Sequence, residues 1–200
     1  MTAPAGVADD PLSRDFYRRD DRKVAPELLN KVLVSGGRSE RIVEVEAYCG
    51  VDDPASHAYR GLTRRNATMF GPPGHLYVYF TYGMHWCANA VCGEEGVASA
   101  VLLRAGAPLG GIEEMRAVRP RARRDSALCS GPARLCQALG LDRAHDGADL
   151  VTGDRGVTVV DDGTPPPPLP GCSTRVGLTA GIDLPWRWFV PADPNLSRKR

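Results

Sequence analysis

Two runs of strand-forming residues meet at a glycine near the middle of this 200-residue chain. Residues 76–82 and 84–91 are rich in the β-branched and aromatic residues that favour extended backbone. Because only Gly83 separates the two runs, we predict a tight hairpin around Tyr82 and Gly83. Such a hairpin commits the centre of the chain to antiparallel pairing.

Other local signals place strands and helices around this hairpin. Runs of apolar residues predict strands at residues 40–47, 97–104 and 157–160. Helices are predicted at residues 13–19 (with Ser13 as N-cap), 26–34, 112–118 and 131–139, and short terminal elements at 175–178 and 187–190. Because strands gather in the middle with helices on both sides in sequence, we expect an α+β fold. The predicted fold is a single compact domain with a mainly antiparallel, curved β-sheet, a protruding β-hairpin and flanking helices.

The composition and the ends of the chain set further limits. With 42% hydrophobic and 24% charged residues, the chain can bury one good core. Residues 1–12 are predicted to be a disordered tail, residues 13–191 a single domain and residues 192–200 a basic tail. No stretch approaches the ~20 apolar residues of a membrane-spanning helix, and no export signal is visible. The six cysteines include no Cys-x-x-Cys pair, so we expect reduced thiols in an intracellular protein.

The net charge of +1 points to no particular partner, but the arginines are unevenly distributed. They gather between Arg116 and Arg124, with a smaller group at Arg64 and Arg65. Clustered arginines can bind phosphate through paired hydrogen bonds. A solvated, arginine-rich surface explains the same pattern, so both interpretations remain open at this point.

The region after residue 41 combines acids with aromatic rings. Glu44 and Glu46 alternate on one face of a predicted strand, with Val43 and Val45 on the opposite face. Alone, this pattern is typical of a half-exposed strand that carries solvated acids. Within a few dozen residues follow Tyr48, His57, Tyr59, Tyr77, Tyr79 and Tyr82, in a chain that is only 6% aromatic. A bulky ring at a hairpin tip, near other aromatic rings, a carboxylate and arginines, could hold a displaced nucleobase.

Several common catalytic signatures are missing from the sequence. There is no glycine-rich phosphate loop, no Gly-x-Ser-x-Gly elbow, no paired-cysteine zinc site and no zinc-deaminase motif. His85 and Cys87 could in principle hold a metal, but alternate residues near a hairpin are weak evidence. We therefore expect neither a metal nor a cofactor.

Together, these features resemble the alkyladenine (3-methyladenine) DNA glycosylase family. The resemblance covers about residues 13–190. It rests on RIVEVEAY at 41–48, His57, Arg65-Asn66, Met69-Phe70, GHLYVYFTYGM at 74–84, Asn89, VLLR at 101–104, GPARLCQAL at 131–139 and RVG at 175–177.

The resemblance implies a role for each matching residue. Glu46 is similar to the general base that activates water against C1′ of the damaged nucleotide. Tyr48, His57 and Tyr79 resemble the rings that sandwich the flipped base, and Asn89 and Arg104 resemble residues that line the same pocket. Tyr82 resembles the side chain that fills the vacated place in the duplex, with Met84 against it at the DNA surface.

The implied activity is that of a monofunctional DNA glycosylase in base excision repair. It would flip alkylated or deaminated purines out of double-stranded DNA, hydrolyse the N-glycosylic bond and leave an abasic site. Without a lysine between Lys31 and Lys199, the chain offers no evident amine for Schiff-base strand cleavage. The expected backbone contacts are Arg64, Arg65, Arg121, Arg123 and Arg124. We expect a monomer without a membrane partner, cytoplasmic or nucleoid-associated in a bacterium.

Two other functions remain open, and the sequence departs from the family in places. A non-catalytic binder of distorted duplexes would use the same wedge and pocket without needing Glu46. A hydrolase of free nucleosides would need neither Tyr82 nor the arginines. His85 and Trp86 stand where the family often has Tyr and Phe, and residues 165–168 are a proline tract expected to be an extended surface segment.

Overall fold

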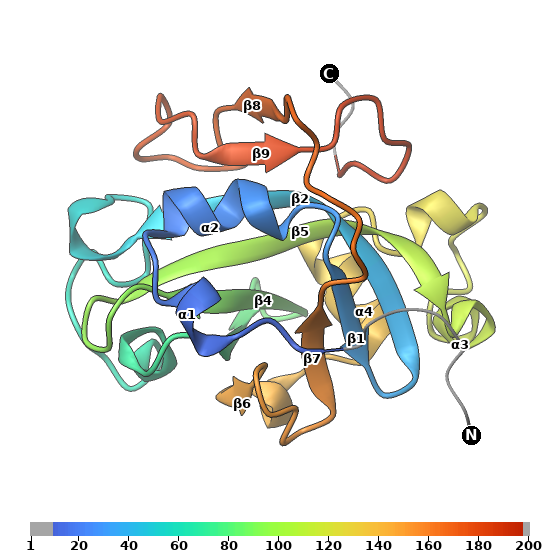
Figure 1. The fold of residues 1–200 in the computed structure, drawn as a ribbon, viewed down its shortest axis with the longest axis horizontal. Helices are drawn as coiled ribbons and strands as arrows, with labels where there is room; N and C mark the ends of the chain where they lie inside the picture. The colour runs from blue at the N-terminus through green and yellow to red at the C-terminus, as the bar shows by residue number, and fades with distance from the viewer. Residues whose placement is uncertain (1–9, 198–200) are drawn as a thin grey trace.

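A curved sheet of nine strands forms the centre of the structure, a computed structural model that describes residues 10–197 (Figure 1). The strands are β1 (Val32–Ser35), β2 (Arg38–Cys49), β3 (His75–Thr81), β4 (His85–Cys92), β5 (Ser99–Gly110), β6 (Ala148–Asp149), β7 (Val157–Val160), β8 (Gly171–Ser173) and β9 (Arg187–Phe189). The main order is β6-β3-β4-β5-β2-β1-β7, and β9 pairs with both β2 and β8. All of these pairings are antiparallel, so the predicted α+β fold is confirmed.

Strand β2 runs through the middle of this sheet. One edge pairs with β5 along most of its length, while the other edge pairs with β1 near its start and with β9 at residues 44–46. Helix α2 (Asp21–Leu28) lies along it in Figure 1. Residues 42–47 are consequently all buried, Glu44 and Glu46 included. The interpretation of these acids as solvated is wrong, because elements remote in sequence cover both faces of the strand.

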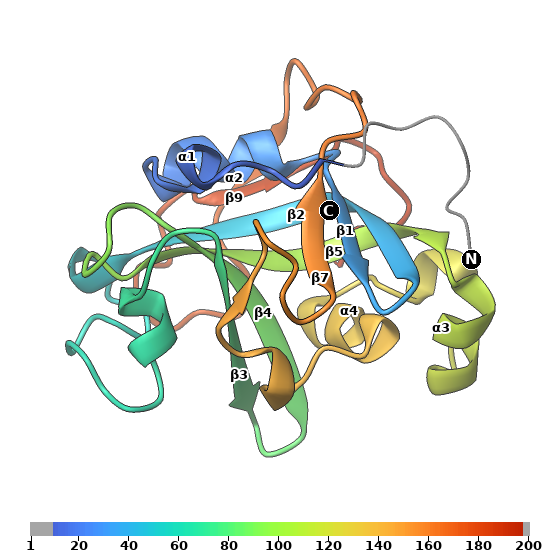
Figure 2. The same cartoon turned by 60° about the horizontal axis from the view of Figure 1, so that its bottom comes forward.

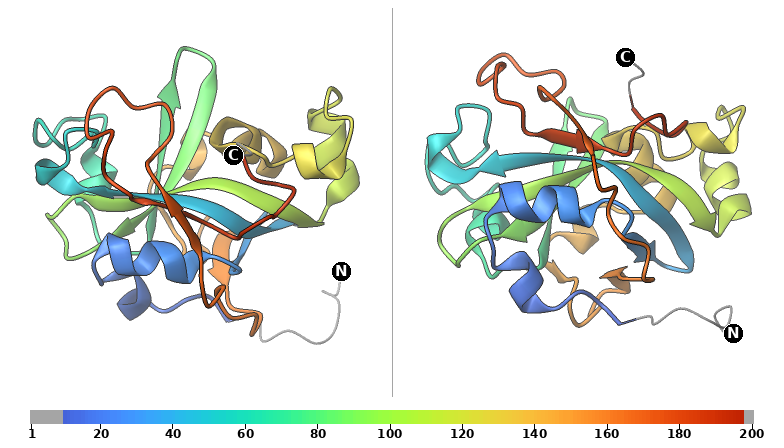
Figure 3. Two further views of the ribbon diagram at one scale, coloured as in Figure 1. Left: turned by 90° about the horizontal axis from the view of Figure 1, so that it is seen from above. Right: turned by 45° about the horizontal axis from the view of Figure 1, so that its top comes forward.

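The other α-helices within residues 10–197 are α1 (Arg14–Tyr17), α3 (Ile112–Val118) and α4 (Pro132–Leu139). The left view of Figure 3 shows α1 and α2 on one side of the sheet, and α3 and α4 on the other. Ser13 caps α1 as predicted, since its side chain accepts a hydrogen bond from the Phe16 N–H. Gly140 ends α4 with a φ of 71°, which confirms the predicted stop.

The helix predicted at residues 26–34 is wrong. Helix α2 begins earlier and ends at Leu28, two residues after Pro26, which cannot donate a backbone hydrogen bond. Asn30 then turns the chain with a φ of 68°. The following residues pair with β2 and β7 as strand β1, so their apolar side chains are core residues of the sheet.

The predicted hairpin is confirmed, and Figure 2 shows it projecting from the body of the molecule. Tyr82 and Gly83 form its turn with φ values of 51° and 66°, the left-handed pair that a type I′ turn requires. Strands predicted at 40–47, 97–104 and 157–160 are present, the first two longer than expected. Residues 175–178 instead form a loop, and strands β6 and β8 were not predicted.

The first residues that the structure describes are tied to the sheet. Pro11 bridges to Val160, and the Leu12 N–H donates to the Val159 carbonyl, so packing begins before Ser13. The tails predicted at residues 1–9 and 198–200 lie outside the described residues. No helix between residues 10 and 197 is long and apolar enough to cross a membrane.

Candidate active site

A cavity of about 250 Å³ opens between the base of the hairpin, strand β5, the start of α4 and the loop that joins β8 to β9. Its walls include the predicted site residues Tyr48, His57, Tyr79, Tyr82, Asn89 and Arg104. Other walls come from Met69, Leu102, Pro132 and residues 176–178. The cavity is slightly smaller than typical ligand pockets of about 300–1,000 Å³, so its size fits one flat ring system.

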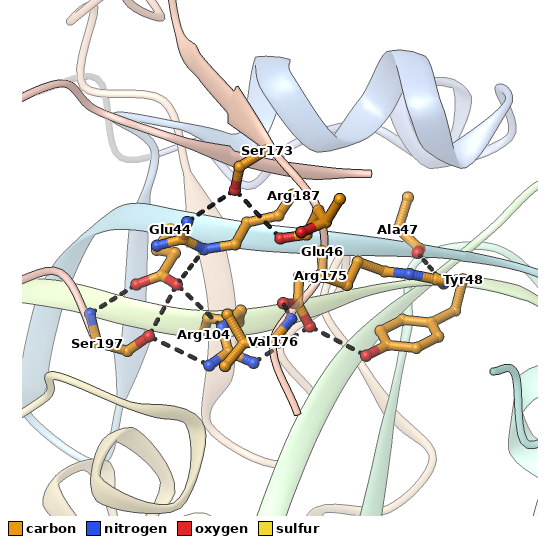
Figure 4. A network of polar contacts seen from close by, with 11 residues as sticks. Glu44, Glu46, Ala47, Tyr48, Arg104, Ser173, Arg175, Val176, Arg187 and Ser197 are labelled. Carbon is orange, nitrogen blue, oxygen red and sulfur yellow. Dashed lines mark hydrogen bonds and ion pairs between the residues drawn. The ribbon is translucent and has the colours of Figure 1, made fainter. Parts of the chain in front are cut away.

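The Glu46 carboxylate lies directly behind this wall, and none of its side chain is exposed. Three hydrogen bonds hold it, from the Tyr48 hydroxyl (3.0 Å), Arg104 Nη1 (3.1 Å) and the Val176 N–H (2.7 Å). Figure 4 shows these donors converging on it from three elements. All three donor residues line the cavity, while Glu46 itself adds no surface to it. A carboxylate has about four acceptor positions, so one on Oε1 remains for a further donor.

Glu44 fixes Arg104 from the other side (Figure 4). Its Oε1 accepts from Arg104 Nε at 3.0 Å and from Arg187 Nε at 2.7 Å. Ser197 adds two more bonds, from its N–H to Oε2 (2.6 Å) and from its hydroxyl to Oε1 (2.8 Å). The Ser197 hydroxyl also accepts from Arg104 Nη2 at 3.1 Å. One guanidinium is thus held at fixed geometry between two buried carboxylates.

The surrounding charges decide the ionisation of this network. Burial by itself would raise the pKa of Glu44, but the charge of Arg104 and the bonds from Ser197 and Arg187 outweigh it and lower the pKa. Burial opposes the charge on Arg104 in the same way, yet Glu46 and Glu44 raise its pKa. Glu44 is therefore an anion that keeps Arg104 charged beside Glu46. Sequence analysis assigned no role to Glu44, Arg187 or Ser197.

One face of the Tyr48 ring packs against Arg175, and its hydroxyl donates to Glu46. The Arg175 guanidinium carbon lies 4.6 Å from the Tyr48 ring centroid and 5.1 Å from that of Trp186. Arg175 is itself fully buried, bonded to the Asp53 carboxylate and to the Ala47 carbonyl at 2.9 Å. Arg175 therefore sets the orientation of the Tyr48 ring. The RVG segment marked Arg175 in the sequence, but nothing local showed what it contacts.

His57, Tyr77 and Tyr79 form a connected group of rings. The His57 and Tyr79 centroids are 4.4 Å apart in an edge-to-face pair, and Tyr79 stacks on Tyr77 at 5.4 Å. The His57 Nδ1 and the Tyr77 hydroxyl share a hydrogen bond of 3.1 Å. Because His57 and Tyr79 touch, no base fits between them. A base held by all three predicted rings would lie between Tyr48 and the His57–Tyr79 pair.

The loop that carries His57 is held by Asn66. The buried Asn66 amide donates to the His57 carbonyl at 2.8 Å and to the Gly61 carbonyl at 3.0 Å. His57 is exposed at the rim of the cavity, where contact with the Tyr79 ring removes part of its hydration. This desolvation, together with the charge of Arg65, lowers the pKa of His57 to about 4. The imidazole is therefore neutral at pH 7.

The remaining predicted residues lie in the cavity wall or at the hairpin tip. Asn89 is buried, and its amide donates to the Tyr77 carbonyl at 3.1 Å, which leaves its carbonyl oxygen available as an acceptor. Tyr82 borders the cavity with 83% of its surface exposed, and Met84 beside it is 68% exposed and lies outside the cavity wall.

Comparison with known proteins identifies the family of this chain. The family model of methylpurine-DNA glycosylase matches residues 15–194, nearly the whole chain. The chain belongs to the methylpurine-DNA glycosylase family. It is therefore a DNA N-glycosylase, an enzyme that acts on DNA, and the resemblance inferred from the motifs is confirmed.

Individual relatives agree with the family match. A protein of Burkholderia lata is 58% identical over 93% of this chain and 90% of its own length. Relatives from Streptomyces avermitilis and Chlorobaculum tepidum are 51% and 47% identical over 95% and 94% of this chain, and 92% and 90% of their own lengths. Each of the three is provisionally named a 3-methyladenine DNA glycosylase.

The arginines predicted to contact DNA lie on the surface of this glycosylase family member. Arg64, Arg65, Arg121, Arg123 and Arg124 are all exposed. The rest of the second cluster is engaged within the protein, since Arg116 pairs with Asp125 at 2.8 Å and Arg119 bonds Gln137 at 2.7 Å. In the second cluster, Arg121, Arg123 and Arg124 are therefore the arginines that remain to contact phosphates.

Metal and thiol chemistry have little support among residues 10–197. No group of three or more His, Cys, Asp or Glu side chains in this range is arranged to hold a metal ion, His85 and Cys87 included. The six cysteines are free thiols, four of them buried. Cys49, next to Tyr48, donates to the Asp21 carboxylate at 3.1 Å, and its pKa is raised by burial and by that charge.

Proposed function

We propose that this enzyme is a monofunctional glycosylase that removes alkylated or deaminated purines from double-stranded DNA. It would flip the damaged nucleotide into the cavity and hydrolyse its N-glycosylic bond with a water activated by Glu46. The observation that carries the proposal is the buried Glu46 carboxylate directly behind the wall of an aromatic cavity, held by three residues that line it and with one acceptor position unused.

The chemistry of bond cleavage needs a group of this kind. Breaking an N-glycosylic bond develops positive charge on the sugar, as in other glycoside cleavages. A carboxylate near C1′ stabilises that charge and takes the proton from the attacking water. Arg104, Tyr48 and the Val176 N–H fix the Glu46 oxygens, so the free position on Oε1 has a defined direction for a water.

The aromatic walls favour damaged bases over normal ones. A purine alkylated at N3 or N7 is cationic, and the Tyr48 and Tyr79 faces would stabilise such a cation by about 0.5–2 kcal/mol. Because the low pKa keeps His57 neutral, its ring does not repel the cation. A deaminated purine is neutral and would depend on hydrogen bonds instead. The family resemblance implies that Asn89 lies near the purine 2-position and disfavours the guanine amino group.

The hairpin tip supports base flipping. Extracting a base from duplex DNA requires a few kcal/mol, and a side chain that takes its place in the stack offsets that requirement. Tyr82 is exposed, aromatic and next to the cavity mouth, so its ring would enter the stack with Met84 against it.

The lysines support a monofunctional reaction. Lys31 is buried and its amine bonds Asp161 at 2.5 Å, so it is not a free nucleophile. Lys23 is in helix α2, on the side of the sheet opposite α4, whereas the cavity includes the start of α4. We expect no covalent enzyme–DNA adduct after borohydride treatment during turnover. A trapped adduct would contradict the monofunctional assignment.

The decisive experiment uses duplexes that each carry one defined lesion, followed by alkaline cleavage of the abasic product. Glu46→Gln should reduce base release at least ~100-fold and still bind the duplex. Glu94→Gln, on an exposed side chain, is the matched control and should behave as wild type. Duplex binding without base release by both wild type and Glu46→Gln would favour a non-catalytic binder. Free nucleosides hydrolysed as fast as duplex DNA would favour a nucleoside hydrolase.

A further inference from the structure

The hairpin has a second hollow on the face opposite the cavity. Adjacent positions of a strand point to opposite faces of a sheet, so the pairs Tyr79–Cys87 and Phe80–Trp86 lie on different faces. Cys87 lines the cavity, whereas Phe80 and Trp86 line a groove of about 540 Å³. None of the steps proposed above, base flipping, base binding or hydrolysis, takes place in this groove.

An exposed aromatic pair forms the floor of the groove. The Phe80 and Trp86 rings are 4.7 Å apart at 49°, and Phe80 has 45% of its surface exposed. Trp86 packs partly on the core, which fixes its ring in place beside the exposed Phe80. Fixed aromatic faces beside a nucleic-acid site serve as stacking platforms for bases of any sequence.

The rim of the groove is positively charged. Arg64, Arg65 and Arg143 line it and are exposed. The acid in the lining, Asp146, already accepts a hydrogen bond from the Val78 N–H at 3.0 Å. Arg65 connects the two faces, since its guanidinium carbon lies 5.7 Å from the Tyr79 centroid and its Nη2 donates to the Phe80 carbonyl at 3.2 Å. Arg65 and Tyr79 thus lie between the groove and the proposed base pocket, and the rim has the charge that phosphate requires.

We propose that this groove binds a nucleotide of the DNA next to the flipped one. Its base would stack on Phe80 and Trp86, and its phosphate would contact Arg64 and Arg143. A side chain inserted at the hairpin tip fills the vacated position but also kinks the duplex and partly unstacks the adjoining base step, so a neighbouring base can turn toward the groove. The inference rests on the proposed function, because it needs the hairpin to enter the duplex.

The test compares two surface substitutions with matched controls. Phe80→Ser removes the exposed ring, and Arg143→Ala removes one rim charge. Their controls are Leu169→Ser, an apolar side chain 84% exposed between β7 and β8, and Arg18→Ala, a half-exposed arginine after helix α1. Thermal unfolding first establishes that all four variants fold like wild type. Affinity is then measured for a duplex that carries a stable abasic-site analogue, at several salt concentrations.

We expect Phe80→Ser to raise Kd about tenfold with an unchanged salt dependence. Arg143→Ala should raise Kd and reduce the slope of log K against log salt by about one. A 2-aminopurine beside the analogue should be quenched by wild type and not by Phe80→Ser. If both variants bind with the same affinity as their controls, the inference is overturned. Base release by wild type in the same preparation would show that the proposed function still holds. Absence of base release by wild type would refute the proposed function itself.

Discussion

Tyr82 holds a backbone conformation that its side chain disfavours. Its φ of 51° lies in the left-handed region, where a bulky residue with a Cβ is strained by about 1–2 kcal/mol. Its ring is 83% exposed, so little burial is lost when it is removed. Asparagine adopts this region several-fold more readily. We therefore predict that Tyr82→Asn makes the protein more stable by about 1 kcal/mol.

For a chain of 200 residues, that gain corresponds to a Tm higher by about 2–4 °C. The same variant should release bases from duplex DNA poorly, because the wedge is gone, and lose less activity on single-stranded DNA. Thermal unfolding and single-turnover base release measure the two effects on one preparation. The matched control is Tyr59→Asn, which removes a ring 50% exposed at a position without positive φ.

Two results would refute this reasoning. A Tm of Tyr82→Asn equal to or below that of wild type would show that the turn carries no strain. Full activity of Tyr82→Asn on duplex DNA would show that the ring is not the wedge. Stability and function conflict at this one residue, a pattern common where strain is stored at a functional site.

Two further predictions concern buried acids. Glu40 is fully buried and burial raises its pKa to about 8, with the Cys129 thiol offsetting only part of this. The folded state therefore keeps a proton that the unfolded chain loses, and the free energy of unfolding should fall by about 5 kcal/mol between pH 4.5 and 8. Glu40→Gln should abolish that fall in urea unfolding at pH 5 and pH 8, and an identical fall in both proteins would contradict it. Glu44→Gln leaves Arg104 and Arg187 without their shared anion and should lower stability by about 3–5 kcal/mol, measured by urea unfolding. A loss below 1 kcal/mol would show that this ion network is not needed for folding.

The elements that could be predicted are those whose signals are local. The hairpin follows from two runs of β-formers around Gly83, and α4 from Pro132 in its first turn and Gly140 after its last. Family resemblance added the site residues, and the cavity assembles most of them. Their roles in catalysis and DNA contact stay predictions.

What could not be predicted depends on distant partners. Apolar spacing at residues 26–34 fits a helix, but part of it is a strand because it pairs with β2 directly ahead and with β7 more than 100 positions later. Glu44 is buried because Arg104, Arg187 and Ser197 surround it, from 60 to 153 positions away. The two-residue strand β6 has no signal of its own and exists through its pairing with β3.

The bond between Ser197 and Glu44 matters for anyone who engineers this protein. Because the backbone N–H at 197 is a direct ligand of the buried acid, shortening the chain to residue 196 would remove a support of Arg104 itself. Affinity tags are better fused ahead of residue 10, where the nearest ordered contacts are with the edge strand β7 and not with the ion network.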